Sequence, residues 1–259
     1  MDVLPVSEFV LLSDRQPLEI VLSDELSSCS YLPGRMARLP FRLPIRPLLP
    51  HEFDQRLAAG DRRHGMGFYC PDCPECQACE AIRLDLQHYP LNKTQRRILR
   101  KGDRILHVEI APPQLTQSRI DLFEKHKWGR GLADNDTEPI DLERYHAFIV
   151  ERLVNSFEIR LWLGEALVGV AITDEGKESL SAHYTFFDPD YPHLSLGTYA
   201  ILQQIRYGQV NHKRYLYLGL FVGDNAHMRY KARFLPHERR VMGEWKRFDR
   251  ETIDKSFLR

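Results

Sequence analysis

The sequence predicts an α+β protein with two lobes, a small loop-rich N-terminal lobe over residues 1–110 and a larger lobe over residues 111–259. Short apolar runs interrupted by Pro and Gly, together with a dense group of cysteines, indicate the first lobe. Apolar residues at helical spacing, followed by alternating strand patterns, indicate the second. With 259 residues, 43% of them hydrophobic, the chain can bury a substantial core.

The N-terminal lobe is expected to contain short elements. The apolar run 18–22 predicts an edge strand, and Pro33-Gly34 predicts a turn. Residues 35–50 contain four prolines and should be extended and irregular. Residues 51–60 have helical spacing that ends at a glycine, and 81–86 alternates as a strand does. A lobe of this type often needs a metal or a partner lobe to stay ordered.

The C-terminal lobe begins after Pro112-Pro113, and Asp141 is expected to cap its second helix. The expected elements are helices at 114–128 and from 141, an exposed loop at 129–140 between them, strands at 157–163, 167–173 and 180–187, a helix at 196–205 and a strand at 215–222. This order resembles the GNAT acyltransferase fold. In that fold the strands before and after the central helix splay apart, and the gap holds the acyl donor.

Four of the five cysteines, Cys70, Cys73, Cys76 and Cys79, stand at every third position of one stretch. Neighbouring pairs would close only very small disulfide loops, and the fifth, Cys29, makes the count odd. Thiolates at this spacing are good ligands for a zinc ion or an iron–sulfur cluster, with Cys29 as a remote ligand supplied by the fold. The alternative is a reduced surface segment that binds nothing.

The formal net charge is zero, with 36 basic and 36 acidic residues, so no global field attracts nucleic acid. Two segments are locally basic: residues 93–104 carry six basic side chains against one acid, and 227–240 interleaves basic residues with Met228, Tyr230 and Phe234. A solvated helix face or strand edge accounts for any single charge run. Two such runs with apolar residues favour a polyanionic partner such as RNA.

A cytoplasmic location without a membrane partner is expected. No window approaches the run of about 18 apolar residues of a membrane span. The N-terminal residues 1–9 lack the basic head and apolar run of a secretory signal. Free-thiol chemistry agrees with a reducing compartment.

Seven phrases in order, spread over about residues 25–245, resemble the bacterial aminoacyl-tRNA–protein transferases, that is, the aspartate/glutamate leucyltransferases and arginyl-tRNA–protein transferases of the N-degron pathway. The phrases are Cys29–Gly34, Cys73–Cys79, Thr94–Arg97, Leu180–Pro189, Ser195–Leu202, Tyr217–Gly219 and Met228–Pro236. The resemblance implies a cysteine-bearing N-terminal lobe and an acyltransferase lobe. It implies transfer of an amino acid from charged tRNA to the α-amine of proteins that begin with Asp or Glu, marking them for degradation.

The resemblance also implies a zinc or iron–sulfur site, although the chemistry itself needs no cofactor. Cys70 stands where many bacterial relatives have Arg, so the implied ligands are Cys29, Cys73, Cys76 and Cys79, with Cys70 as an additional candidate. Residues 126–136 also depart from the family pattern. Leucine is the favoured donor because compact bacterial members typically use it, and arginine is the alternative.

The donor is an activated ester, so the protein has to hold the tRNA end, deprotonate an N-terminal ammonium and stabilise one oxyanion. No Ser-His-Asp or Cys-His nucleophile pattern stands out, and direct aminolysis needs none. Tyr184 and Asp188, at the end of a cleft-lining strand, are the predicted catalytic residues. Asp188 could accept or orient the amine proton, or simply open a turn. His183 should point opposite Tyr184 if the strand is regular.

Predicted binding residues lie in four places. Arg96 and Arg97 would pair with a carboxylate or a tRNA phosphate, with Arg62 and Arg63 as second candidates. Backbone N–H groups at the start of the central helix could meet a phosphate or the terminal adenosine, and the hydroxyls there could instead be caps. The residues concerned are Ser195, Gly197, Thr198 and Tyr199 at the helix, Tyr217 and Gly219 on the far wall, and Tyr230, Lys231 and Arg233 as tRNA contacts.

Two alternatives belong to other classes. A metal-stapled RNA-binding or redox-sensing protein without catalysis would lack the polar residues at 184, 188 and 195–199, and they are present. An acetyl-CoA-dependent acetyltransferase would need a glycine-rich loop before the central helix, where residues 193–198 supply one glycine. The sequence therefore favours the aminoacyltransferase.

Overall fold

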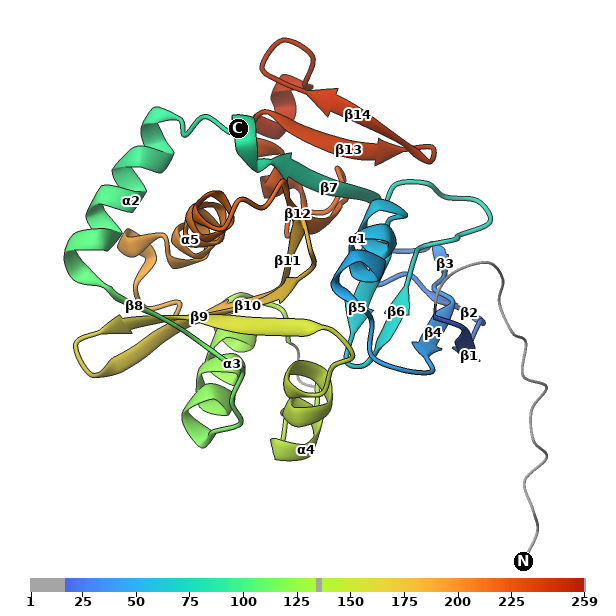
Figure 1. Ribbon diagram of the computed structural model, residues 1–259, viewed down its shortest axis with the longest axis horizontal. Coiled ribbons are helices and arrows are strands. Elements are labelled where there is room, and N and C mark those ends of the chain that lie inside the picture. Colours follow the sequence, from blue (N-terminus) through green and yellow to red (C-terminus); the bar gives the residue numbers. More distant parts are fainter. Residues whose placement is uncertain (1–16, 134–136, 259) are drawn as a thin grey trace, which may run out of the picture.

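An eight-stranded sheet organises the chain (Figure 1) in a computed structural model that describes residues 17–133 and 137–258. Its strands lie in the order β14-β13-β7-β12-β11-β10-β9-β8. They are β7 Glu80–Asp85, β8 His107–Ala111, β9 Asn155–Leu163, β10 Ala166–Glu175, β11 Ser179–Phe187, β12 Tyr215–Phe221, β13 His237–Val241 and β14 Glu244–Phe248. Residues 1–9, used for the signal-sequence expectation, and 134–136 of the predicted loop lie outside the described ranges.

A four-stranded sheet in the order β1-β4-β6-β5 forms the N-terminal part. Its strands are β1 Glu19–Ser23, β4 Phe41–Pro44, β5 Arg62–His64 and β6 Gly67–Tyr69, and β2 Leu26–Ser28 pairs separately with β3 Met36–Arg38. The edge strand predicted at 18–22 is confirmed as β1. The prediction of irregular chain over 35–50 is wrong in part, because β3 and β4 lie there with prolines flanking or ending them.

The helix predicted at 51–60 is α1, Pro50–Ala58. Proline suits its first turn, and Glu52 accepts a hydrogen bond from the Leu49 N–H at 2.7 Å. Gly60 follows the helix with a φ of +94°, a conformation typical of a glycine after a helix end. Phe53 of α1 packs against Phe68 of β6, with ring centroids 6.2 Å apart.

Strands from the first 110 residues also belong to the large sheet. β7 pairs with β12 on one side and with β13 on the other, and β8 pairs with β9. The β13–β14 hairpin has no counterpart among the predicted elements. The predicted lobe boundary near residue 110 stays a prediction.

The element order predicted for the C-terminal part is confirmed, and the α+β fold class with it. Its helices are α3 Gln117–Gly129, α4 Leu142–Tyr145 and α5 Leu196–Val210, and α2 Lys93–Ile105 precedes them. Asp141 caps α4 by accepting from the Arg144 N–H at 2.8 Å. The helix expected from Asp141 continues after α4 as a π-helical turn, His146–Val150.

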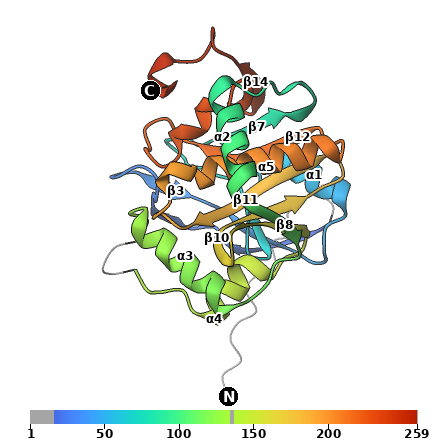
Figure 2. The ribbon, with the colours of Figure 1, turned by 90° about the vertical axis from the view of Figure 1, so that its left-hand side faces the viewer.

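The helices cover the two faces of the sheet as separate layers (Figure 2). α5 and α2 lie on one face, where residues such as Ile159, Leu180 and Ile205 form the larger core. α3 and α4 lie on the other, where Phe123, Ile172 and neighbouring side chains form a second core. No helix in the two described ranges has the length and apolar character needed to cross a membrane.

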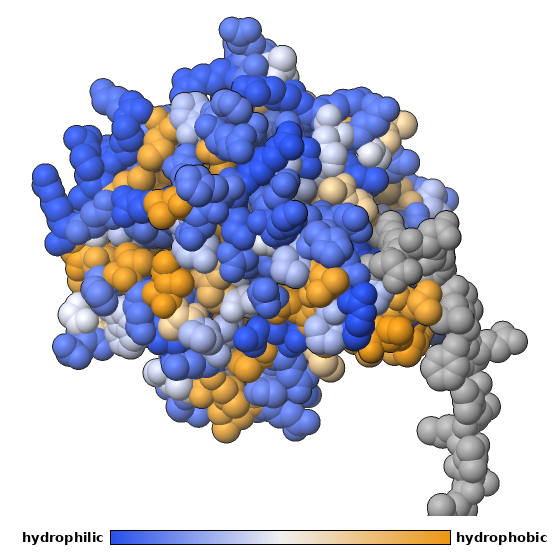
Figure 3. All heavy atoms as spheres, viewed as in Figure 1, coloured by the Kyte–Doolittle hydropathy of each residue, from blue (hydrophilic) through white to orange (hydrophobic). Residues whose placement is uncertain are grey.

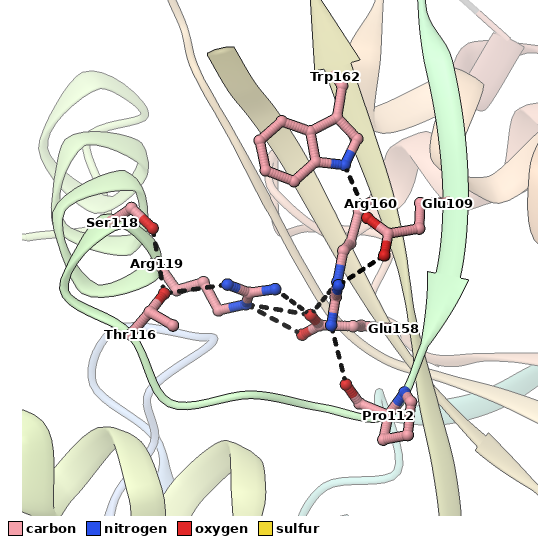
Figure 4. Close-up of polar contacts among 8 residues, drawn as sticks. All are labelled: Glu109, Pro112, Thr116, Ser118, Arg119, Glu158, Arg160 and Trp162. Atoms are coloured by element: carbon pink, nitrogen blue, oxygen red, sulfur yellow. Dashed lines mark hydrogen bonds and ion pairs between the residues drawn. The ribbon is translucent and has the colours of Figure 1, made fainter. Parts of the chain in front are cut away.

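A buried ionic cluster fixes α3 and β8 to β9 (Figure 4). Glu158 is fully buried and accepts from Arg119 Nε at 3.0 Å and from Arg160 Nε at 2.5 Å. Arg160 also donates to Glu109 at 2.8 Å and to the Pro112 carbonyl at 3.1 Å. Because each buried charge depends on its partner, loss of one member leaves the others uncompensated.

Candidate functional site between β11 and β12

β11 and β12 run parallel but pair only at their beginnings, where Ser179–Ser181 face Tyr215–Tyr217. Farther along, β11 stays paired with β10 and β12 stays paired with β7. The predicted separation of the strands that flank the central helix is therefore confirmed. The open side of each strand presents backbone and side chains to the space between them.

β11 bulges at His183, because its register with β10 shifts between Ala182 and Tyr184. The expectation that His183 and Tyr184 point to opposite faces is wrong, since the bulge interrupts the strand alternation. Both rings contact Phe148, at centroid distances of 5.5 and 5.3 Å. The His183 Nε2 is buried without a hydrogen-bond partner among the described residues. Burial and then the charge of Arg63 lower the pKa of His183 to about 3, so its ring is neutral.

β12 bulges at Leu218, and the following Gly219 has a φ of +90°, which favours glycine. Arg62 of β5 lies against this glycine: a Cβ added at Gly219 would stand 2.4 Å from Arg62 Nη1. The Arg62 Nε is buried without a hydrogen-bond partner in the described chain. No carboxylate of the described residues forms an ion pair with this guanidinium. A cation without an acidic partner in the described chain therefore lies against Gly219 of β12.

Lys231 brings a second cationic group to the same strand. It lies on the short helix Arg229–Arg233, is 7% exposed, and donates from Nζ to the Leu220 carbonyl of β12 at 2.6 Å. Burial and then the charge of Arg62 lower the pKa of Lys231 to about 7. The ring of Tyr230, which is 39% exposed, has its centroid 6.0 Å from this ammonium nitrogen.

Arg63, the neighbour of Arg62, fixes β5 to the large sheet. Its Nε and Nη2 donate to the two carboxylate oxygens of Asp174 at 2.8 and 3.0 Å. Ser156 Oγ donates to the same carboxylate at 2.5 Å. Burial opposes ionisation of Asp174, yet the charge of Arg63 holds its pKa below the usual range. Because side chains alternate along a strand, this clamp leaves Arg62 directed to the other side of β5.

The arrangement is suited to an anion. Arg62 offers a planar guanidinium, Lys231 an ammonium group and His183 a ring nitrogen without a hydrogen-bond partner. Among the described residues, the only carboxylate that pairs with any of the three is Asp174, which lies 4.0 Å from His183 Nδ1. A carboxylate is the group that an arginine fork binds with both oxygens. The sequence named Arg62 only as a second candidate and gave His183 no role. Lys231 was predicted to contact tRNA, and its side chain is buried in this arrangement.

The two predicted catalytic residues lie on the α3 side of β11. Tyr184 stacks on Phe123 with ring centroids 5.2 Å apart, and burial followed by the charge of Glu124 raises the pKa of Tyr184 to about 12. Asp188 accepts from the Asp190 N–H at 3.0 Å and from Lys125 Nζ at 2.7 Å. This geometry is that of a turn opening, which was the alternative for Asp188. Its role as a base stays a prediction.

The start of α5 shows what its predicted residues do locally. Ser195 precedes the helix with a φ of +52° and makes no side-chain capping bond. Gly197 lets the helix approach Phe187, since a Cβ there would stand 2.8 Å from the ring. Thr198 is half-buried. Tyr199 is fully buried and donates its hydroxyl to Asp103 at 2.9 Å, so the binding role predicted for Tyr199 has no support in this arrangement.

The remaining predicted binding residues are dispersed. Tyr217 is 4% exposed and its hydroxyl accepts from Arg83 at 2.9 Å, so its ring packs in a core rather than in the gap. Arg96 and Arg97 are exposed on α2, whereas Arg62 belongs to β5. Arg233 is exposed on the same short helix as Lys231. The structure thus brings Gly219, Tyr230 and Lys231 together and leaves the others apart.

No disulfide joins the five cysteines, all of which lie in the described ranges and are half-buried. Burial raises the pKa of Cys79 to about 12, and the thiols of Cys73, Cys29, Cys76 and Cys70 add to the shift. Cys29 Sγ accepts the N–H groups of residues 31 and 32 at 3.4 Å. Within the described chain, no three Cys, His, Asp or Glu side chains are arranged to hold a metal ion. The metal site at these cysteines stays a prediction.

Comparison with known proteins gives a consistent result. Residues 27–97 match the family model of the arginine-tRNA-protein transferase N terminus, and residues 118–241 match that of its C terminus. An aspartate/glutamate leucyltransferase of Acinetobacter baumannii is 34% identical over 86% of this chain and 82% of its own length. One of Vibrio cholerae is 34% identical over 90% of this chain and 99% of its own.

Two solved structures are also similar. The C-terminal domain of a lysylphosphatidylglycerol synthetase from Agrobacterium fabrum matches with a TM-score of 0.45 and 13% identity over 68% of this chain. FemX matches with a TM-score of 0.41 and 7% identity over 64% of this chain. The match covers 54% of the first structure and 59% of the second, little more than half of either.

Proposed function

The chain belongs to the arginine-tRNA-protein transferase family, and we propose that it moves leucine from leucyl-tRNA to the α-amine of proteins that begin with Asp or Glu, marking them for degradation. Family membership makes it an aminoacyltransferase. The activity named for its relatives supports leucine as the donor amino acid and acidic residues as the acceptors.

In this reaction the neutral α-amine attacks the ester carbonyl carbon of leucyl-tRNA. A C–N bond forms, the C–O bond to the terminal ribose breaks, the amine loses a proton and the ribose oxygen gains one. An α-amine with a pKa of about 8 is partly neutral near pH 7, and the ester is already activated. Positioning of the two substrates is therefore the main task of the protein.

The observation that carries the acceptor assignment is the unpaired pair of cations at β12. Arg62 and Lys231 lie at the bulge of this strand without an acidic partner among the described residues. The carboxylate of a leading Asp or Glu would pair with the Arg62 fork and accept from Lys231. A leading Gln or Ala would leave both cations without an anionic partner, which is the source of discrimination.

The start of α5 supports the donor side. The first N–H groups of a helix have no intrahelical acceptor, so those that follow Ser195 can bind polar groups of the tRNA end. α5 follows β11 after residues 188–195, which include the short helix Pro192–Leu194. These N–H groups therefore come from the β11 side of the gap, and the cations lie at β12 on its other side.

The test is transfer of radiolabelled leucine or arginine from charged tRNA to peptides beginning with Asp, Glu, Gln or Ala. We expect leucine transfer to Asp and Glu peptides only. Transfer of arginine instead would keep the mechanism and overturn the donor. Absence of transfer from either tRNA to acidic N-termini would contradict the proposed function.

The variant Arg62→Gln tests the recognition of the acidic residue, and Arg35→Gln, at an exposed position, is its matched control. We expect kcat/KM for the Glu peptide to fall by about 10-fold or more in Arg62→Gln, because a charge-assisted pair is lost. The control should not change. An unchanged kcat/KM for the Glu peptide in Arg62→Gln would show that Arg62 does not recognise the carboxylate.

A further inference from the structure

The exposed face of α2 is strongly basic and its charges are not compensated. Arg97, Arg100, Lys101 and Arg104 are exposed and lie three, four and seven residues apart, so they share one side of the helix. None of them forms an ion pair with a carboxylate in the described part of the chain. The one acid of the helix, Asp103, pairs with Arg206 at 2.7 Å.

These side chains surround a hollow on the surface. Arg97, Arg100, Lys101, Arg104 and Ile105 line a groove of about 360 Å³. The side of the molecule that α2 forms is dominated by hydrophilic residues in the space-filling view (Figure 3). Seven residues of helix extend about 10 Å, so the four charges form an elongated track rather than one point.

α2 is joined to the start of α5, which borders the gap between β11 and β12. Lys101 Nζ donates to the carbonyl of His193, two residues before Ser195. Gly102 lies against the ring of Tyr199, where a Cβ would stand 2.1 Å from a ring carbon. α2 crosses in front of α5 in Figure 2. A polyanion that lies along α2 therefore reaches the open end of the gap.

We propose that Arg97, Arg100, Lys101 and Arg104 of α2 bind the phosphate backbone of the tRNA acceptor arm and direct its aminoacylated end to the start of α5. This proposal rests on the proposed function for the identity of the polyanion. A row of arginines on a helix suits phosphates, whose oxygens each guanidinium can bind with two donors. The contacts are to backbone, so they hold the donor without selecting its sequence.

The test compares tRNA binding by the wild-type protein, the triple variant Arg97→Gln/Arg100→Gln/Arg104→Gln and a control of equal charge loss, Lys177→Gln/Lys246→Gln/Arg247→Gln. The control positions are exposed; Lys177 lies in the turn between β10 and β11, and the other two lie on β14. Binding of uncharged leucine tRNA is measured by fluorescence anisotropy at several salt concentrations. Circular dichroism and the thermal midpoint verify that each variant is folded.

We expect the triple variant to bind tRNA about 10-fold or more weakly at moderate salt, and the slope of log K against log salt to fall by about 2 to 3. Each phosphate that the protein neutralises releases counterions, so the change in slope measures how many phosphates the three arginines bind. The control should keep the wild-type slope. KM for a Glu peptide should stay unchanged in both.

Wild-type affinity and slope in the triple variant would overturn the proposal. A raised KM for the Glu peptide with unchanged tRNA affinity would overturn it too, because the face would then bind an acidic protein. Binding is measured without transfer, so a protein that binds tRNA through α2 but transfers no amino acid would contradict the proposed function alone.

Discussion

Replacement of Lys231 by Met should make the protein more stable and less active. The pKa of this ammonium falls from 10.5 to about 7 on folding, because the side chain is buried and Arg62 is nearby. At 1.36 kcal/mol for each pKa unit, the charged form costs roughly 5 kcal/mol of folding free energy. Methionine has a similar length and no charge. The variant loses the hydrogen bond to the Leu220 carbonyl, which contributes about 1 kcal/mol.

The gain should depend on pH in a defined direction. The folded pKa lies below the unfolded one, so between pH 7 and 10.5 the unfolded chain binds more protons and wild-type stability rises with pH. Below pH 7 the wild type bears the full penalty. We expect Lys231→Met to be more stable by about 2 to 4 kcal/mol at pH 6, and to lose this advantage by pH 10.

Urea unfolding at pH 6, 8 and 10 measures the difference, with Lys177→Met as the control at an exposed lysine. Transfer to Glu peptides, measured in parallel, should fall by about 10-fold or more while the folded state becomes more stable. A variant that is less stable than wild type at pH 6, or a difference that does not change with pH, would refute the reasoning.

Three further predictions concern other parts of the fold. Glu158→Gln should lower the free energy of unfolding in urea by about 3 kcal/mol or more, whereas Glu109→Gln should lower it by about 1 kcal/mol or less, because the Glu109 side chain is 40% exposed. Equal losses would contradict the role of burial. Gly219→Ala should destabilise the protein by more than about 1 kcal/mol and raise KM for Glu peptides, since the new Cβ meets Arg62, and unchanged KM would argue against this contact. The His183 ring should show no protonation by NMR between pH 5 and 8, because its pKa is about 3, and a midpoint in that range would show that the ring is not held in a dry site.

The order of elements was predictable because it depends on local patterns. Alternating apolar residues in β9, β10 and β11 and helical spacing in α5 are present in short windows of sequence. The β13–β14 hairpin was not predictable, because residues 237–248 are rich in charged side chains and have the pattern of a solvated basic segment. Arg239 of this hairpin instead pairs with the distant Glu80 at 3.0 Å and lies over the ring of Phe248.

The candidate site was predicted only in part, because bulges and distant contacts build it. A regular strand would place His183 and Tyr184 on opposite faces, and one extra residue in β11 removes that alternation. Arg62 reaches Gly219 from a strand far away in the sequence. The burial of Lys231 was not predictable either, because no local sequence pattern indicates that its ammonium donates to the Leu220 carbonyl.

Adjacent arginines on β5 have different partners, and this difference argues for a binding role of one of them. Arg63 has a complete set of acceptors, Asp174 and the Gly65 carbonyl, and holds β5 in place. Arg62 has a buried Nε without an acceptor in the described chain. A buried unsatisfied donor costs about 1–3 kcal/mol, so a purely structural site would favour its replacement. The cost is offset if a substrate carboxylate supplies the missing acceptor. The unsatisfied Arg62 Nε, which destabilises the free enzyme, then becomes the group that binds the acidic N-terminus.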